Sequence, residues 1–514
     1  MPEPREPVIA IAMDSMELSL VRAGIEEGWL PTLADLVRRG RSGVLTGLQA
    51  LLPGAAWPTL TTATTPDQHL AVLDRQLRPH GYAFDQLDYT DLRRPGFWSY
   101  AGDAGLRTTI ASVHGAPIMP GLPGTQLIGW GNHDPWTRWR VIASPPEILH
   151  GLDEEVGPRL TAEQEPFRTH ADFRRNLGRA LRGVAQQSVG LTHLMRSTAW
   201  DLFLGAFNEA HPVGHRFWHH HDRSHPDHDP EAPADLRDAI LHLYRDLDAG
   251  LGRVLRESPT GATFVAYAVH GMGPNHVRGE PVEIALERGG WLVRTGASRG
   301  VLRVRAYSAA RSLAQMVVPG PIRRAIGSRI PTTMFLTQVS LANVDWTRTR
   351  AFALPGDITS LIRLNVSGRE EMGTVSRGEE YDRVCAEIED ALCELVDDAG
   401  RPAVAEVVRT DALLGRPVDE VLPDLIVRWG GHPIERVRSE RLGVIEIPRL
   451  DPRTGCHLPD GWLIAVGPNI DPGSEPLREV LGRIEDVGPT LLERLGVAVP
   501  DALDGTPIDS LHRR

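Results

Sequence analysis

The chain has 514 residues, of which 41% are hydrophobic and 24% charged, so it has the composition of a globular protein with ample material for a large core. Its 67 acidic residues outnumber its 55 basic residues, and the formal charge of −12 argues against sequence-independent binding to nucleic acid or to an anionic membrane. A small-molecule partner is therefore the better expectation.

The cysteine and lysine counts exclude further classes of chemistry. Three cysteines are an odd number and too few for a disulfide framework in a chain of this length. Lysine is absent, which excludes lysine-based Schiff-base chemistry and indicates a GC-rich bacterial genome. No basic segment followed by an apolar stretch lies near Met1, and no apolar run approaches the roughly 20 residues that span a bilayer. We therefore expect a cytoplasmic protein that does not enter the membrane.

Apolar runs of strand length alternate with helical patterns, which predicts an α/β fold with a mostly parallel central sheet and helices on both faces. In chain order, the expected strands are Val8–Met13, Thr108–Val113, Gln126–Trp130, Asp201–Phe207, Thr263–Val269, Leu361–Val366, Asp424–Arg428 and Trp462–Val466. The expected helices are Glu17–Glu27, Pro31–Arg39, Phe173–Met195, Ala234–Leu255, Glu379–Val396 and Pro489–Leu495. We expect residues 1–514 to form a single domain of this kind.

The alternation is lost between about Gly279 and Thr349, where the chain is rich in arginine and helical in period. We interpret residues 279–349 as a helical insertion that caps the sheet within the same domain. Its arginines could bind an anionic substrate, but arginines at helical spacing more commonly form a solvent-exposed helix face.

Three expected strands lead directly into residue types that bind metals. VIAIAMD ends in Asp14, DLFLGAFNEAH in His211 and TFVAYAVH in His270. Because ligands gather at the carboxyl ends of parallel strands, these side chains could share one edge of the sheet. A single histidine at a strand end usually forms hydrogen bonds within the protein and binds no ligand. Three strand ends with metal-ligating residue types together favour a metal site.

The segment EAHPVGH is the strongest local signal, because His211 and His215 are four residues apart. Pro212 suits the first position of a helix, so both imidazoles would lie on one face within reach of one ion. The alternative is a pair of surface histidines, as in the WHHHDRSHPDHDP tract that follows. That tract could bind metal weakly, although a solvated loop is the more common explanation.

Further motifs follow one another along nearly the whole chain. They are AMDSMELSLVRAGIEEGWLPTLADLVRRG, AWPTLTTATTPDQH, NEAHPVGHRFW, VHGMGP, WTRTRAF, RLNVSGREEMG, PDLIVRW, TGCHLPDGWLIAVGP and DVGPTLLERLGVAVPDALDGTP. Their order resembles the type I phosphodiesterase and nucleotide pyrophosphatase branch of the alkaline phosphatase superfamily. The resemblance implies the α/β fold of that superfamily and its metal-dependent chemistry.

The resemblance also implies a ligand set, with departures from the family pattern. One family metal is held by an aspartate, a histidine and a late histidine, and those positions here are His211, His215 and His457. Three imidazoles suit zinc with an open fourth position. Asp14 and His270 match ligands of the family's second metal, but Val269 stands where that ion would have an aspartate. One zinc ion is therefore expected, with a second left open.

The usual threonine or serine nucleophile aligns with Pro53, which has no nucleophilic side chain. A shifted alignment would make Thr59 the nucleophile, although a hydroxyl inside a helix more often bonds to its own backbone. Without a nucleophile, direct attack by metal-activated water remains, with Glu209 as general acid or base or, equally, as an orienter of a ligand histidine. Asn208 and Trp57 are the candidate substrate-binding residues.

These observations predict a metal-dependent hydrolase of a phosphodiester, a pyrophosphate or a related anionic ester. The departures at Pro53 and Val269 keep open a repurposed mononuclear-metal enzyme that performs non-phosphoryl hydrolysis, elimination or group transfer in a biosynthetic pathway. A third interpretation is an inactive binding protein, which the retention of five candidate ligands disfavours.

Overall fold

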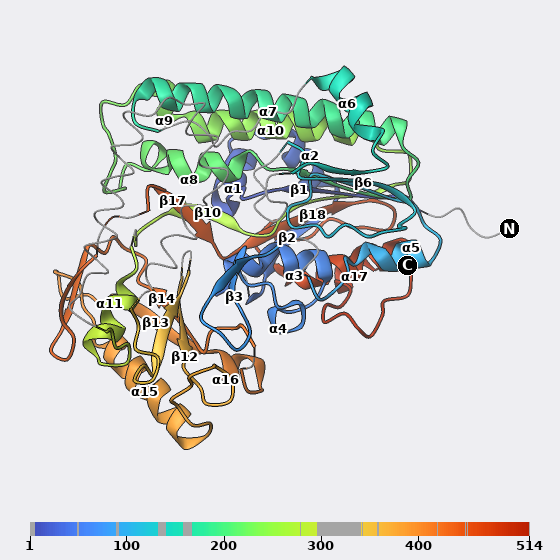
Figure 1. Ribbon diagram of the computed structural model, residues 1–514. Coiled ribbons are helices and arrows are strands. Elements are labelled where there is room, and N and C mark those ends of the chain that lie inside the picture. The colour runs from blue at the N-terminus through green and yellow to red at the C-terminus, as the bar shows by residue number, and fades with distance from the viewer. Residues whose placement is uncertain are drawn as a thin grey trace. The chain divides into compact units, whose positions relative to one another are not determined.

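The computed structural model describes residues 6–48, 51–88, 92–131, 140–157, 167–277, 279–295, 341, 343–356, 359–418, 420–447, 449 and 451–512. The chain forms two compact units (Figure 1). Unit 1 contains Met1–Asp74, Asp88–Asn275 and Arg453–Arg514, and unit 2 contains Arg75–Leu87 and His276–Pro452.

A large sheet forms the centre of unit 1. Its strands, in spatial order, are β19 (Val480–Arg483), β2 (Arg41–Thr46), β18 (Gly461–Val466), β9 (Thr263–Ala268), β1 (Val8–Met13), β8 (Leu202–Phe207), β5 (Thr108–Ala111), β6 (Gly124–Ile128) and β7 (Ile142–Ser144). The run β9-β1-β8-β5-β6 is parallel throughout, whereas β18 and β7 pair antiparallel with their neighbours in that run. The predicted α/β fold with a mostly parallel central sheet is therefore confirmed.

Helices cover both faces of this sheet, and the alternation along β1 shows why (Figure 1). Successive strand residues point to opposite faces, so Ile9, Ile11 and Met13 enter one core cluster while Val8, Ala10 and Ala12 enter another. The first cluster packs against α1 (Leu18–Glu26), α2 (Pro31–Arg39), α7 (His170–Ser197), α8 (Ala210–His221) and α10 (Ala239–Arg256). The second packs against α3 (Ala56–Thr62), α5 (Trp98–Asp103) and α17 (Val487–Arg494). The remaining helices of unit 1 are α4 (Pro66–His69), α6 (Ile148–Val156) and α9 (Ala234–Arg237).

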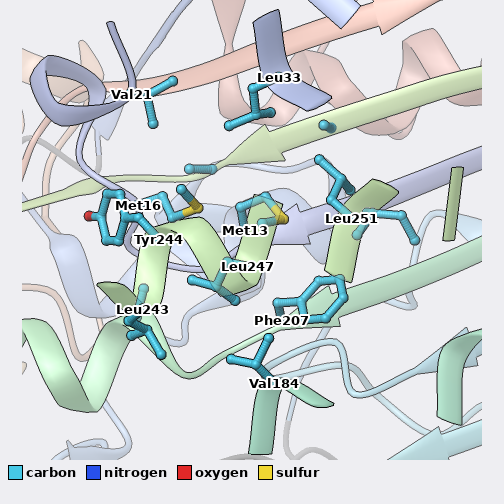
Figure 2. Close-up of a cluster of buried hydrophobic side chains, with 14 of the residues drawn as sticks. Met13, Met16, Val21, Leu33, Val184, Phe207, Leu243, Tyr244, Leu247 and Leu251 are labelled. Carbon is cyan, nitrogen blue, oxygen red and sulfur yellow. The ribbon is translucent and has the colours of Figure 1, made fainter. Parts of the chain in front are cut away.

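Figure 2 shows part of the first cluster, where Met13 and Phe207 from adjacent strands face Leu247 and Leu251 of α10. All four side chains are at most 2% exposed. Burying a side chain of this size stabilises the fold by roughly 1.5–3 kcal/mol, so this interface contributes strongly to holding the strand ends in place.

The N-terminus of α2 depends on a residue from a distant helix. Leu30 provides no side-chain cap, and Asp248 of α10 instead accepts hydrogen bonds from the backbone nitrogens of Thr32 (2.9 Å) and Leu33 (2.8 Å). Replacing Asp248 by alanine leaves two buried N–H groups without acceptors, so we expect the free energy of unfolding to fall by about 1–3 kcal/mol. Urea unfolding measures this loss, with Asp246→Ala on the same helix as the control. Equal effects of the two substitutions would contradict the capping role.

Unit 2 is built on a separate antiparallel sheet in the order β11 (Ala351–Leu354), β12 (Thr359–Leu364), β14 (Leu425–Trp429) and β13 (Val404–Arg409). The helices described in this unit are α11 (Pro281–Arg288), α15 (Glu379–Cys393) and α16 (Thr410–Leu414). It also contains two hairpins, β3 (Arg75–Leu77) with β4 (Phe84–Gln86) and β15 (Arg436–Ser439) with β16 (Gly443–Glu446).

Several expected elements need correction. The strands expected at Leu361–Val366 and Asp424–Arg428 exist, with shifted bounds, but they pair antiparallel in unit 2 and do not join the central sheet. The residue pattern of this segment does not distinguish a parallel from an antiparallel strand, because β12 is buried along its whole length and both kinds of strand can be fully buried. The helix expected at Ala234–Leu255 is divided at Asp238 into α9 and α10. The expected capping insertion, residues 279–349, falls largely on residues 296–340, which lie outside the described residues.

None of the helices in the described part of the chain combines the length and the apolar character needed to cross a bilayer.

Candidate metal centre

Three strands of unit 1 end together at one edge of the sheet. β1 lies between β8 and β9 and is parallel to both, with Met13 opposite Phe207. The Asp14 backbone nitrogen, just beyond β1, donates to the Phe207 carbonyl at 2.9 Å. Asp14, the Asn208–His211 segment and His270 therefore follow their strands at the same carboxyl edge.

His457 reaches this edge from the opposite chain direction. It lies on β17 (Gly455–Leu458), which pairs antiparallel with β10 (Gly271–Pro274) so that His457 is opposite Met272. The following strand, β18, is antiparallel to β9, so the start of β18 lies beside the end of β9. The antiparallel strand thus brings a late histidine to the residues that follow the parallel strands.

His211, His215 and His457 form a compact group of imidazoles. One ring nitrogen from each lies within 4.8 Å of the other two, and the Nε2 atoms of His211 and His457 are 3.3 Å apart. Two nitrogens bound at 2.0–2.1 Å to a tetrahedral zinc ion lie about 3.3–3.4 Å apart, so this spacing fits that ion. We call these residues the three-imidazole centre. Among the residues that the structure describes, it is the one such group of three potential ligands.

Hydrogen bonds at Nδ1 orient two of the three rings. His215 donates from Nδ1 to the Gly455 carbonyl oxygen at 2.8 Å, and His211 donates from Nδ1 to Asp14 Oδ2 at 3.0 Å. Both contacts leave Nε2 with its lone pair, which is the arrangement of metal-binding histidines in proteins. Gly455 is required for the first contact, because a Cβ there would clash with the Gly214 carbonyl oxygen on α8.

Asp14 is a buried carboxylate held by several donors. Its Oδ1 accepts from the Trp57 indole nitrogen (3.3 Å) and from the Ser15 hydroxyl (3.3 Å). Burial by itself would raise the pKa of Asp14, but the neighbouring imidazoles, His211 first, lower it below its ordinary value. Asp14 therefore stays ionised and lies where it can orient His211.

His270 lies against the three-imidazole centre. Its ring centroid is 4.2 Å from that of His457, and its Nδ1 donates to the Gly271 carbonyl oxygen at 3.2 Å. Burial lowers the pKa of His270 to about 3, so the ring is neutral at pH 7. The adjacent Val269 is fully buried in the apolar cluster on the other face of the sheet.

Glu209 and Asn208 are buried at the end of β8. The Asn208 backbone nitrogen donates to Glu209 Oε2 at 3.1 Å, and the Asn208 side-chain nitrogen donates to the Ser112 carbonyl oxygen at 3.0 Å. Within the described structure, Glu209 Oε1 and Asn208 Oδ1 have no hydrogen-bond partner. Burial raises the pKa of Glu209 to about 8, so this carboxyl group holds a proton at neutral pH.

The raised pKa of Glu209 predicts a pH-dependent stability. The ordinary glutamate pKa is 4.5, so the folded state binds this proton more tightly than the unfolded state. The contribution of this proton to the free energy of unfolding is fully present below pH 4.5 and is lost as the pH rises through about 8. The free energy of unfolding falls by up to about 1.4 kcal/mol per pH unit over this range. We expect Glu209→Gln, compared with wild type in metal-free protein, to gain relative stability between pH 5 and 8. Parallel pH profiles from urea unfolding would contradict this.

Thr59 and Trp57 each form a hydrogen bond with another buried side chain. The Thr59 hydroxyl lies 3.0 Å from His69 Nε2, and His69 Nδ1 accepts from the Ala71 backbone nitrogen, so His69 donates to Thr59. Trp57 donates to Asp14, as described above. Pro53, at the position of the usual nucleophile, begins the short 3₁₀ helix Pro53–Ala55.

His114 was not selected from the sequence. It follows β5, which is parallel to β8, and its ring centroid is 6.4 Å from His211 and 5.8 Å from Trp57. The side chain is 7% exposed. The expected strand Thr108–Val113 leads directly into His114, so the strand-end argument that selected Asp14, His211 and His270 would have found it.

Several solved structures contain chains that are similar to this one. Solved structures with similar chains include phosphonoacetate hydrolase from Sinorhizobium meliloti 1021 in complex with phosphonoformate, at 15% identity, 97% of each chain covered and a TM-score of 0.49. Another is an inactive form of murine ectonucleotide pyrophosphatase/phosphodiesterase 5 in complex with AMP, at 11% identity, 96% of each chain covered and a TM-score of 0.48. No curated protein shows significant sequence similarity to this chain.

The family model of type I phosphodiesterases and nucleotide pyrophosphatases matches residues 8–427. This range contains the three strand ends, the EAHPVGH segment and most of both units. The chain therefore belongs to the type I phosphodiesterase/nucleotide pyrophosphatase family.

Proposed function

We propose that this chain is a metal-dependent hydrolase of a phosphodiester, a pyrophosphate or a related anionic ester. The observation that carries the proposal is the convergence of His211, His215 and His457, with two Nε2 atoms at the spacing of zinc ligands. Membership of a family of hydrolases supports the reaction class.

The charges of the site favour an anionic substrate. A zinc ion held by the three imidazoles would supply Lewis-acid activation of a water molecule and of a substrate oxygen. Imidazoles bind metal in their neutral form, and among the described residues Asp14 is an anionic group bonded to one of them, His211. Asp14 thus orients His211 while leaving the centre with a net positive charge for an anionic ester.

Glu209 is the proposed proton donor. It carries its proton at neutral pH and is two residues from His211 at the end of β8. A protonated carboxyl group beside the reacting ester can give its proton to the leaving oxygen, which general acid catalysis requires. Thr59, by contrast, is bonded to His69, and this supports attack by water without a protein nucleophile.

Turnover by protein with measured metal content tests the proposal. Chelator-treated wild type, reloaded with zinc, is expected to hydrolyse bis-p-nitrophenyl phosphate or a dinucleotide, and His211→Ala is expected to lose both zinc and turnover. His242→Gln, at an exposed position on α10, is the matched control and should retain both. Fully zinc-loaded wild type that hydrolyses none of a panel of phosphodiesters, pyrophosphates and related esters would overturn the proposal.

A further inference from the structure

His220, near the end of α8, is a buried histidine whose ring nitrogens are both unused. The residue is 2% exposed, and neither Nδ1 nor Nε2 has a hydrogen-bond partner among the described residues. A buried polar atom without a partner costs about 1–3 kcal/mol, and buried groups of this kind often mark a water or an ion. His220 therefore indicates a ligand that the polypeptide does not supply.

Three potential metal ligands, His170, His228 and Asp229, lie near His220, on α7 and in the loop after α8. His170, the first residue of α7, has its ring centroid 6.2 Å from that of His220. His170 Nε2 lies 3.1 Å from Asp229 Oδ2. His228 donates from Nδ1 to the His219 carbonyl oxygen at 2.9 Å, which leaves its Nε2 as a ligand atom.

The other side of His220 is aromatic. The ring packs edge-on against Phe173 of α7, with centroids 4.7 Å apart. Burial lowers the pKa of His220 to about 4, and His170, Asp229 and His228 all lie close enough to affect that pKa. The imidazole is thus neutral at pH 7, which is the form that binds a metal.

We propose that His170, His220, His228 and Asp229 bind a second transition-metal ion, separate from the three-imidazole centre. We call these four residues the α8-end cluster. Three imidazoles and one carboxylate are a donor set that suits zinc in a four-coordinate site. The cluster uses the histidine-rich tract after α8, to which the hydrolase chemistry assigns no role.

The α8-end cluster is more open than the three-imidazole centre, because no three of its residues have ligand atoms that all lie within 4.8 Å of one another. The His170 and His220 centroids are 6.2 Å apart, against 4.8–4.9 Å between the rings of the three-imidazole centre. The side chains of His170 and Asp229 are 42% and 39% exposed, so they can turn toward His220 without disturbing the core. A site that closes as it binds is expected to be weaker than a preformed one, so this ion should be the first that a chelator removes.

Zinc stoichiometry tests the proposal without reference to turnover. Chelator-treated protein is dialysed against buffered zinc, and the ions per chain are counted by mass spectrometry. Wild type is expected to bind two ions, and His220→Ala and Asp229→Asn are each expected to bind one. His170→Gln removes an exposed ligand without opening the core and should weaken the second ion at least tenfold. His242→Gln should bind two.

Variants of the other centre separate this site from its alternatives. His457→Ala should retain the α8-end ion, and the double variant His220→Ala/His457→Ala should bind none. One ion in wild type that is lost in His457→Ala and retained in His220→Ala would overturn the proposal. Two ions in wild type, with both retained in His220→Ala and one lost in His270→Ala, would place the second ion at Asp14 and His270 and would equally overturn the proposal. Circular dichroism and thermal melting of each variant exclude a loss of fold as the cause.

Discussion

Replacing His457 by alanine is expected to abolish zinc binding at the three-imidazole centre and to lower kcat/KM at least about 1,000-fold, equivalent to about 4 kcal/mol of transition-state stabilisation. His457 supplies one of the two Nε2 atoms that are 3.3 Å apart, so its removal leaves two imidazoles on one helix, which is too few for a stable site. Metal content and steady-state kinetics measure the two losses on the same preparation.

Graded variants distinguish ligands from the residues that orient them. Asp14→Asn keeps all three imidazoles but removes the carboxylate from His211 Nδ1, so a loss of about 10–100-fold in metal affinity or activity is expected. His270→Ala should leave this ion bound, because His270 donates from Nδ1 to the backbone and is not one of the three grouped ligands. Complete loss of zinc in His270→Ala, with His457→Ala still loaded, would show that the ligand set has been assigned wrongly.

The second large effect is expected in unit 2, where Arg369 and Asp424 form a buried ion pair. Arg369 Nη1 and Nη2 bond to the two oxygens of Asp424 at 2.8 and 2.7 Å, and the residues are 4% and 0% exposed. Tyr381 also donates to Asp424, at 2.9 Å. Arg369→Met removes the direct ion-pair partner of Asp424 and one of the two partners of Glu370, leaving Arg363 as the nearby cation. The free energy of unfolding of unit 2 should therefore fall by about 3–5 kcal/mol.

A paired substitution isolates the cause of that loss. Burial alone would raise the pKa of Asp424, but Arg369 lowers it below the ordinary 3.8. The ionised Asp424 therefore stabilises the folded state above about pH 4, and this stabilisation is lost as the pH falls through the lowered pKa. Arg369→Met/Asp424→Leu removes both charges and should recover most of the stability. Urea unfolding at pH 7, with exposed Arg383→Met as the control, checks this; a double variant as unstable as Arg369→Met would contradict it.

Local sequence signals predicted the elements with strong boundaries. The bounds of α2, Pro31–Arg39, match the prediction because proline suits the first turn and Gly40 follows the last. β1 also matches, since its apolar run is bounded by proline and aspartate. β2, β7 and β19 were missed, because none has a clear apolar pattern: β7 and β19 are edge strands of three and four residues, and β2 begins with Arg41, Ser42 and Gly43.

The amino-acid sequence by itself determined the family, the parallel core of the sheet and the candidate ligands on EAHPVGH, because these depend on residue identity and on local spacing. Tertiary structure alone decided that Asp14 bonds to His211, that Thr59 bonds to His69, and that the strands at 361–366 and 424–428 belong to a separate antiparallel sheet. Only the fold brings His114 beside Trp57 and leaves both nitrogens of His220 without a hydrogen-bond partner among the described residues. The physical reason is that such contacts join residues far apart in the chain, and their geometry is set by strand pairing and helix packing, for which local spacing carries no signal.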